Sequence, residues 1–106
     1  MTLDTRTTVR ARTATITLTG DVDAASAPVL DEAIAAAAAT SPQRLVLDLN
    51  AVPYLSSAGL RCLVFAHQRL GRGVEIVLAG AHPDVAETVR LAGFDRVATI
   101  EDQVGG

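Results

Sequence analysis

Two adjacent serines, Ser56 and Ser57, are the residues of this sequence whose type and position could do chemistry. They stand in the stretch NAVPYLSSAGLR, residues 50–61, between a proline-interrupted apolar run and a Gly-Leu pair. This spacing predicts a strand and a short loop that lead into a helix beginning at the serines. A serine hydroxyl at such a point can cap the helix, accept a phosphoryl group or act as a nucleophile.

The two hydroxyls are predicted to have different roles. Ser56 is a natural N-cap, whose oxygen accepts a hydrogen bond from a first-turn N–H and contributes about 1 kcal/mol. Ser57 is then the first helical residue, beside unpaired N–H groups and the positive end of the helix dipole. Phosphorylation would add about −1.5 to −2 charges there without unfolding the helix, and the small Ala58 and Gly59 leave the hydroxyl open. The sequence therefore favours Ser57 as the site of a reversible switch.

Nucleophilic catalysis fits the same residues less well. LSSAG, residues 55–59, supplies the serine and the second glycine of the nucleophile elbow G-x-S-x-G, but Leu55 replaces the first glycine. His67 falls within the predicted apolar stripe of the helix, about three turns from Ser57, and His82 is more simply a helix-entry residue before Pro83. We therefore predict no catalytic residue and do not expect an enzyme.

Length, composition and charge limit the class of protein. The chain has 106 residues, 49% hydrophobic and 3% aromatic, which suits a single folding unit with an aliphatic core. We predict one domain over residues 1–106, with its core at about 7–101 and a frayed tail at 102–106. All nine basic residues are arginine and the net charge is −3, so we expect no nucleic-acid partner.

Motifs for cofactors, disulfides and membranes are absent from the sequence. There is no G-x-x-x-x-G-K-[ST] loop, no G-x-G-x-x-G fingerprint and no Cys/His ligand spacing, so we predict no cofactor and no metal. The single cysteine, Cys62, cannot form an internal disulfide and is interpreted as a passive small residue. No signal-peptide core is present, and no apolar run approaches the roughly 20 residues that cross a bilayer. We expect a cytoplasmic protein without membrane insertion.

The first elements of the chain follow from its hydrophobic periodicity. Alternation over residues 7–12 and 14–19 predicts a hairpin whose inward side chains are Val9, Ala11, Ile16 and Leu18. A helix should follow, with Ser26 as its N-cap and Pro28 in its first turn, and should run to about Thr40. Its predicted buried stripe is Leu30, Ala33, Ile34 and Ala37.

The rest of the chain alternates between strands and helices. Buried strands are predicted at residues 44–50, 74–80 and 96–100. Between them lie a helix from the serine pair to about Gly71 or Gly73 and a helix that starts at Pro83 and ends before Gly93. This order indicates a single α/β domain: a mixed four- to five-stranded sheet opened by a β-hairpin and flanked by three to four helices.

Charged and aromatic residues near the serines are candidates for contact with another protein. Arg61 and Phe65 are predicted to lie on the exposed face of the second helix, with Arg69 and Arg72, opposite a stripe of Leu60, Leu63, Val64 and Leu70. An exposed aromatic residue among arginines is typical of an interface, although a lone surface phenylalanine can also be without function.

Three aspartates have both a structural and a functional interpretation. Asp21 and Asp23 precede the first helix, where they either contact a partner or serve as ordinary acids at a helix start. Asp48 interrupts an apolar strand, and because a buried carboxylate is costly unless it is paired or hydrogen-bonded, it should face a loop or emerge at the end of the strand. It is either an anchor for the serine loop or has a direct functional role. Asp48 has no neighbouring Asp, Glu or His cluster in the sequence and is a poor candidate for a metal site.

Three segments in register resemble the STAS family. They are LTGDVDAASAPVL (18–30), LVLDLNAVPYLSSAGLRCLV (45–64) and AGAHPDVAETVRLAGFDRVATI (79–100), and the resemblance spans about residues 14–100. It implies a small mixed sheet flanked by helices. For the anti-sigma factor antagonists of this family it also implies partner switching: the unphosphorylated protein binds an anti-sigma factor with serine kinase activity and frees the sigma factor, and phosphorylation of a serine at the start of the second helix dissociates the complex.

The resemblance places the phosphate acceptor at Ser57, because Gly59 and Leu60 match the family pattern D-S-[ST]-G-L. Ser56 stands where that pattern has an acid and Ala58 follows the acceptor, so Ser56 is an alternative acceptor. A phosphatase is an implied second partner. The predicted partner-binding residues are Asp21, Asp23, Ser56, Ser57, Ala58, Gly59, Arg61 and Phe65. An alternative function is that of a STAS-like accessory subunit of a bacterial lipid-transport ABC complex, in which the same helix end is a permanent interface.

Overall fold

A five-stranded sheet forms the base of the molecule. The computed structural model describes residues 3–102, and its strands lie in the order β1 (Asp4–Arg10), β2 (Thr13–Thr19), β3 (Arg44–Ala51), β4 (Glu75–Ala79) and β5 (Thr99–Glu101). β1 pairs with β2 in the antiparallel sense, and each later pair is parallel. The expected mixed sheet opened by a hairpin is confirmed.

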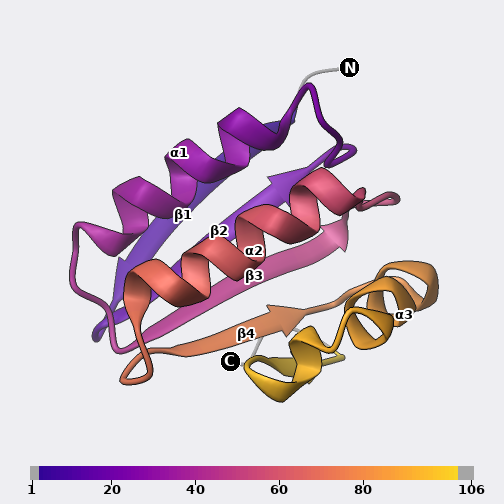
Figure 1. The fold of residues 1–106 in the computed structure, drawn as a ribbon. Helices are drawn as coiled ribbons and strands as arrows, with labels where there is room; N and C mark the ends of the chain where they lie inside the picture. Colours follow the sequence, from indigo (N-terminus) through magenta and orange to yellow (C-terminus); the bar gives the residue numbers. More distant parts are fainter. Residues whose placement is uncertain (1–2, 103–106) are drawn as a thin grey trace.

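Helices α1 (Ala27–Ala38), α2 (Ser57–Leu70) and α3 (Pro83–Leu91) flank this sheet, and a short 3-10 helix, η1 (Phe94–Arg96), follows them. Figure 1 shows α1 and α2 side by side across one face of the sheet, whereas α3 lies beside the end of β4. α1 and α2 each return the chain between two parallel strands, so both helices begin at the carboxyl ends of the strands.

The hydrophobic core lies between the sheet and these two helices. All four members of the predicted stripe of α1 are buried, namely Leu30, Ala33, Ile34 and Ala37. They belong to one cluster with buried side chains of the central strands, which include Ile16, Leu18, Leu45, Leu47, Ile76 and Leu78. Alanine at two positions of the stripe leaves no bulk to hold the helix away from the sheet, so α1 packs closely on it.

The hairpin differs from the sequence-based expectation at its turn. Ala11 and Arg12 form that turn with φ values of 48° and 66°, so Ala11 does not face the core as expected. Two successive left-handed residues are the geometry of a type I′ turn, whose twist matches that of the flanking strands. Val9, also expected to face inward, is 48% exposed, because β1 is the outermost strand and has a neighbour on one side only.

The last strand is shorter than expected and begins later. Instead of a strand at 96–100, the chain forms η1 and then β5, which starts at Thr99. Gly93 stands just past the end of α3 in the left-handed conformation (φ 77°), as its position predicts, and buried Phe94 follows it. Residues 96–98, which were predicted to begin the strand, instead belong to η1 and the turn that follows it. Residues 103–106 of the predicted frayed tail lie outside the described residues.

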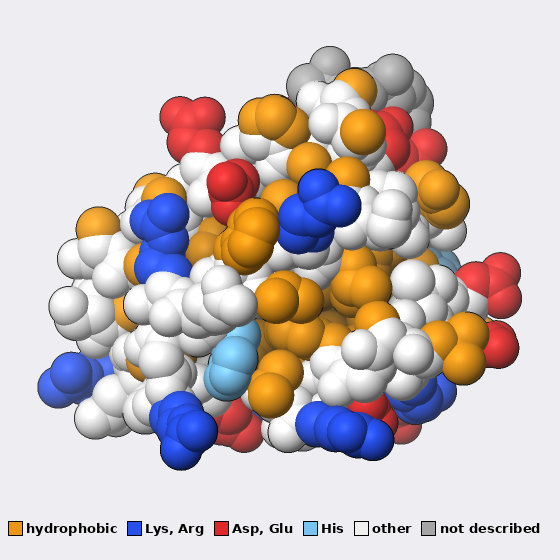
Figure 2. Space-filling view, in the orientation of Figure 1, with side chains coloured by type: hydrophobic (Ala, Val, Ile, Leu, Met, Phe, Trp, Pro, Cys, Tyr) orange, Lys and Arg blue, Asp and Glu red, His pale blue; other side chains and the backbone are white. Residues whose placement is uncertain are grey.

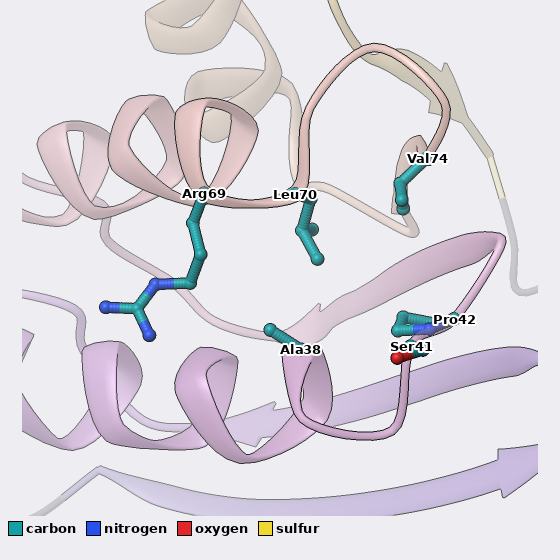
Figure 3. Close-up of a pocket in the computed structure, with 6 residues that line it drawn as sticks. All are labelled: Ala38, Ser41, Pro42, Arg69, Leu70 and Val74. Carbon is teal, nitrogen blue, oxygen red and sulfur yellow. The ribbon is translucent and has the colours of Figure 1, made fainter.

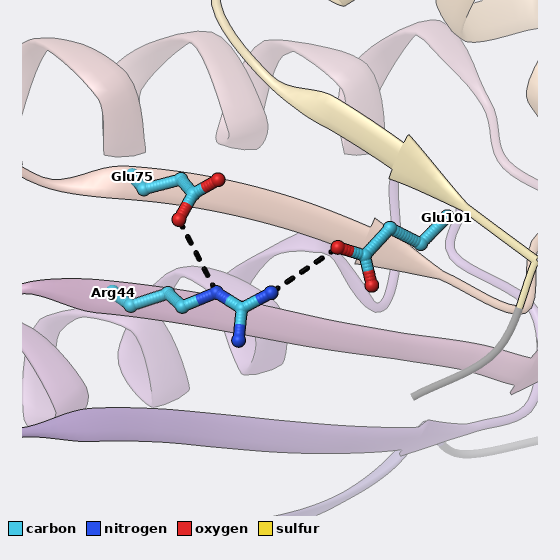
Figure 4. A network of polar contacts seen from close by, with 3 residues as sticks. All are labelled: Arg44, Glu75 and Glu101. Atoms are coloured by element: carbon cyan, nitrogen blue, oxygen red, sulfur yellow. Dashed lines mark hydrogen bonds and ion pairs between the residues drawn. The ribbon is translucent and has the colours of Figure 1, made fainter. Parts of the chain in front are cut away.

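The face of the sheet opposite α1 and α2 carries a small cluster of its own. Val46, Val77 and Ala79 are buried on this face. On the same face, Arg44 Nε lies 3.3 Å from Glu75 Oε1, and Arg44 Nη2 lies 3.2 Å from Glu101 Oε1 (Figure 4). Because these side chains are one-third to one-half exposed, each pair contributes at most about 1 kcal/mol. The network spans β3, β4 and β5 and so connects the short edge strand to the centre of the sheet.

Candidate partner-binding surface

The two loops that carry the predicted site residues are hydrogen-bonded to one another. The N–H of Val22 donates to the carbonyl of Tyr54 at 2.9 Å, and the N–H of Ser56 donates to the carbonyl of Val22 at 2.8 Å. Val22 and Leu55 thereby form a parallel bridge beyond the ends of β2 and β3. This bridge brings the Asp21–Asp23 segment beside the start of α2, so these residues and the serines lie at the same edge of the domain.

The two serines occupy different environments. Ser56 has an extended backbone (φ −84°, ψ 172°), and its Oγ accepts a hydrogen bond from the N–H of Gly59 at 3.3 Å. Its role as the N-cap of α2 is therefore confirmed. Ser57 is the first residue of α2 and is exposed. One hydroxyl thus completes the helix start, and the other projects from the positive end of the helix dipole.

Gly59 lets the first turn of α2 sit directly on the loop bridge. A Cβ atom at this position would lie 2.5 Å from Cγ1 of Val22 and 2.7 Å from Cδ1 of Leu55, both of which are buried side chains. No real Cβ contact is that short. Gly59 is buried and Ala58 is half-buried, although both belong to the predicted partner-binding set. Gly59 therefore supports the start of α2, and with it the two serines, by packing against the loop bridge.

Ser26 stands at the N-cap position of α1, as predicted, but its side chain does not cap the helix in the expected way. The backbone of Ser26 is already helical (φ −96°, ψ −10°), and its side chain makes no cap hydrogen bond. Instead Asp23 Oδ1 accepts from the N–H of Ser26 at 2.9 Å, and Ser26 Oγ accepts from the N–H of Asp23 at 2.9 Å. This reciprocal pair is a capping box one turn ahead of α1.

The capping box also favours the ionised form of Asp23. The hydrogen bond from the N–H of Ser26, followed by that from its side chain, lowers the pKa of Asp23, because both bonds favour the ionised carboxylate. Asp23 therefore has a definite structural role at the helix start. Asp21 is half-buried on the same loop, and its carbonyl oxygen lies 2.9 Å from Ser26 Oγ, as a second acceptor within reach of that hydroxyl.

The outer side of α2 carries an exposed stripe that begins at Ser57. Steps of three and four residues lead from Ser57 to Arg61, Val64, Phe65 and Gln68, all of which are exposed. Phe65 is 51% exposed, as expected, but Val64 is 39% exposed and does not belong to the buried stripe to which periodicity assigned it. The buried side of α2 consists of Gly59, Cys62, Leu63 and Ala66. Val64 and Phe65 therefore add apolar surface next to Arg61.

A groove between α1 and α2 opens beside this stripe. It has a volume of about 270 Å³ and is lined by Ala24, Ala27, Pro28, Asp31, Ala58, Arg61, Cys62 and Phe65. Its walls combine small side chains with one acid from α1 and one arginine from α2. Figure 2 shows apolar side chains gathered along and beside α2 on this face, with arginine side chains next to them. The groove starts one residue from Ser57, at Ala58.

Cys62 lies in the wall of this groove but is buried. Burial raises the pKa of its thiol, and the nearby Asp31 carboxylate raises it further. The thiol donates to the carbonyl of Ala27 at 3.5 Å. These observations agree with the interpretation of Cys62 as a passive packing residue, because a protonated and buried thiol is a poor nucleophile.

The comparison with known sequences decides the family. The profile of the STAS domain family matches residues 4–106. The chain belongs to the STAS domain family. It is 30% identical over 97 residues to the anti-sigma-F factor antagonist RsfB of Mycobacterium tuberculosis, a match that covers 88% of this chain and 80% of that protein. The family resemblance of the three sequence segments is thereby confirmed.

Solved STAS structures have the same architecture. The crystal structure of an anti-sigma factor antagonist from Mycobacterium paratuberculosis matches with a TM-score of 0.88 and 28% identity, over 96% of this chain and 87% of that one. SpoIIAA in its unphosphorylated form matches with a TM-score of 0.77 and 15% identity, over 92% and 87% of the two chains. A structure of Bacillus SpoIIAA in its phosphorylated form is also similar, with a TM-score of 0.70 and 14% identity over 92% and 90%.

The two residues considered for nucleophilic catalysis, Ser57 and His82, are not hydrogen-bonded to one another within residues 3–102. His82 Nε2 instead lies 2.9 Å from the carbonyl oxygen of Asn50. Asp48 Oδ1 accepts from the N–H of Asn50 at 3.1 Å and from its Nδ2 at 2.8 Å. These bonds give Asp48 a structural role within β3, at Asn50, and not in the loop that carries the serines.

Sequence reasoning missed several residues of this surface. Asp31 and Pro28 line the interhelical groove, and Tyr54, which is 54% exposed, stands on the loop that leads to Ser56. The sequence places Asp31 and Pro28 outside the buried stripe of α1, which was the one indication that they could belong to a surface site. Periodicity does not show which neighbouring helix such a position will face. In residues 3–102 no helix is long and apolar enough to cross a membrane, and no cluster of three potential metal ligands occurs.

A larger hollow lies at the opposite end of the helix pair. It has a volume of about 400 Å³ and is lined by Ala38, Ser41, Pro42, Arg69, Leu70 and Val74 (Figure 3). These residues come from the last turns of α1 and α2 and the loops that follow them. Of the residues that line this hollow, none belongs to the predicted partner-binding set.

Proposed function

We propose that this STAS domain is an anti-sigma factor antagonist that is switched by phosphorylation of Ser57. The proposal is supported by the 30% identity with RsfB, whose printed name gives that role, and by the match with the Mycobacterium paratuberculosis antagonist. The observation that carries it is local: Ser57 is exposed at the first position of α2, while Ser56 is engaged as the cap.

The unphosphorylated surface would bind an anti-sigma factor with serine kinase activity and thereby release the sigma factor. Phe65 supplies an exposed aromatic anchor, and Arg61 and Asp31 supply opposite charges at the adjoining groove. Residues Asp21 and Asp23 extend the same surface on the other side of Ser57. An interface of this composition combines an apolar centre with charges that fix orientation.

Phosphorylation would transfer the γ-phosphoryl group of ATP from the bound kinase to Ser57 Oγ. A new bond forms between Oγ and phosphorus, the bond from phosphorus to the bridging oxygen of ADP breaks, and the hydroxyl proton leaves to a base of the kinase. The product carries about −1.5 to −2 charges at a surface that faced the partner, so the complex weakens through repulsion and desolvation. A phosphatase would reset the switch by hydrolysing the ester to serine and inorganic phosphate.

Ser57 is favoured over Ser56 by the hydrogen bond at the helix start. Modifying Ser56 would place a phosphoryl group on the oxygen that accepts from Gly59 N–H and would force this half-buried residue outward. Modifying Ser57 disturbs no hydrogen bond recorded for its side chain within residues 3–102. The helix start therefore remains intact in the phosphorylated state.

The test is phosphorylation by the cognate anti-sigma factor kinase with ATP, with the modified residue located by mass spectrometry. Wild type and Ser56→Ala should both carry one phosphate on Ser57, and Ser57→Ala should carry none. Ser57→Asp should bind the kinase at least tenfold more weakly than unphosphorylated wild type does. Phosphate on Ser56 alone would contradict the site. Absence of phosphate, together with stable copurification of transporter subunits, would support the lipid-transport alternative.

A further inference from the structure

The residue one helical turn beyond Ser57 is an arginine on the same exposed side. Ser57 and Arg61 are separated by four positions on α2, which places their Cβ atoms about 6 Å apart. Both side chains are exposed, and within residues 3–102 Arg61 takes part in no ion pair. An anion four residues ahead of a cation is the more stable order on a helix, because each charge then faces the favourable end of the dipole.

The surroundings of Ser57 favour the pairing of a phosphate with such a cation. The Asp21–Asp23 segment lies beside the start of α2 through the Val22 bridge, and Asp31 lines the groove with Arg61. A phosphoryl group on Ser57 would therefore lie on a surface that also carries acidic residues. The N–H of Gly59 is occupied by Ser56 Oγ, so the third backbone donor of the helix is not free for the phosphate.

We propose that Arg61 is the internal counter-ion of phosphorylated Ser57 and that its capture removes the free cation from the rim of the interhelical groove. The inference rests on the proposed phosphorylation of Ser57. The guanidinium group matches the phosphate with two parallel hydrogen bonds, which a lysine could not provide. The phosphoryl group then acts in two ways: it adds charge at the helix start and it withdraws a contact that the partner uses.

This arrangement explains how a small change can switch a rigid surface. The backbone of α2 is fixed by the Ser56 cap and by the buried Gly59, and neither is altered when Arg61 turns toward Ser57. Only one long, exposed side chain moves. Phe65 and Asp31 stay in place but lose the arginine that stands beside them in the unmodified groove.

The test uses the full chain with phosphoserine incorporated at position 57 during synthesis, so that it does not depend on any kinase. The second pKa of the phosphate, ordinarily about 6, is measured by ³¹P NMR titration. It should be about 0.3 lower in wild type than in Arg61→Gln, as expected for one helical ion pair. Arg61→Lys should show part of the wild-type lowering of the phosphate pKa, because lysine keeps the positive charge but cannot form the two parallel hydrogen bonds of the guanidinium group.

The matched control is Arg69→Gln, which removes another exposed arginine two turns further along α2. Its phosphate should titrate as in wild type. Equal phosphate pKa values in wild type and Arg61→Gln would overturn the inference. That result differs from a failure of the proposed function, in which the kinase leaves Ser57 unmodified while the titration still depends on Arg61.

A binding measurement supplies the second readout. Phosphoserine at position 57 should weaken kinase binding by a smaller factor in Arg61→Gln than in wild type, because the variant has already lost the contact that the phosphate withdraws. An equal factor in both proteins would show that phosphate acts without Arg61 and would contradict the proposal.

Discussion

The two ends of the α1–α2 layer differ in size and in chemistry. The end where both helices begin has the smaller hollow, about 270 Å³, together with Ser57, Arg61, Asp31 and Phe65. The end where both helices terminate has the larger hollow, about 400 Å³, lined mainly by small and aliphatic residues and by Arg69. Predicted partner-binding residues therefore line the smaller of these two hollows and not the larger one.

The direction of the helices explains this difference. α1 and α2 each return between parallel strands, so their unpaired N–H groups gather at one end and their unpaired carbonyls at the other. A phosphate is stabilised at the first end and disfavoured at the second. The strand order thus selects the end at which a negative switch can operate, before any side chain is considered.

The largest expected effect concerns the close contact beneath Ser57. Gly59→Val should lower the free energy of unfolding by about 2–3 kcal/mol, because its side chain overpacks against buried Val22 and Leu55. Gly73→Val, in the loop near the other end, meets nothing within 4 Å and should change stability by about 0.5 kcal/mol or less. Chemical denaturation measures both. Equal losses would mean that the close approach at Gly59 is not what holds the helix start.

The second effect separates the two ends by partner binding. Phe65→Ala should weaken binding of the unphosphorylated protein to the kinase about tenfold. This factor corresponds to about 1.4 kcal/mol, as expected when an aromatic anchor is lost. Arg69→Ala, one turn further toward the opposite hollow, should change affinity by less than about twofold, as for a residue outside the interface. Titration calorimetry measures both affinities. A stronger effect at Arg69 would move the interface to the opposite end.

The third effect separates the two serines by stability. Ser56→Ala removes the oxygen that accepts from Gly59 N–H and should cost about 1 kcal/mol. Ser57→Ala should remain within about 0.5 kcal/mol of wild type, because the residue is an exposed surface position. Thermal unfolding of both variants at neutral pH provides the measurement. A loss confined to Ser57→Ala would reverse the roles assigned to the two hydroxyls.

The smallest effect is an acid dependence carried by the capping box. Because the pKa of Asp23 is lowered in the folded protein, its contribution to stability is present above the ordinary value of about 3.9 and is lost as pH falls through the folded value. Asp23→Asn should therefore flatten the acid side of the stability profile. Ser26→Ala keeps the backbone N–H donor and should flatten it less. An unchanged acid profile in Asp23→Asn would contradict this role.

Local signals were sufficient for much of the fold and for the helix start. The Ser56 cap, the buried stripe of α1 and the left-handed Gly93 all depend on residues within a few positions of one another. Features that depend on such short separations can be predicted from the order of the residues alone. The turn at Ala11 and the start of β5 were predicted wrongly, because a short alternating stretch does not fix where a strand ends.

The sequence by itself determined which serine caps α2 and which one is the first residue of the helix, since both depend on the order of residues around one helix start. Only the tertiary structure decided what surrounds the second serine. The bridge between Val22 and Leu55 brings Asp21 and Asp23 beside it, and the packing of α1 against α2 brings Asp31 to the same groove as Arg61. Val64 became exposed for the same reason: periodicity assigns a residue to a side of its helix, but only packing decides whether another element covers that side.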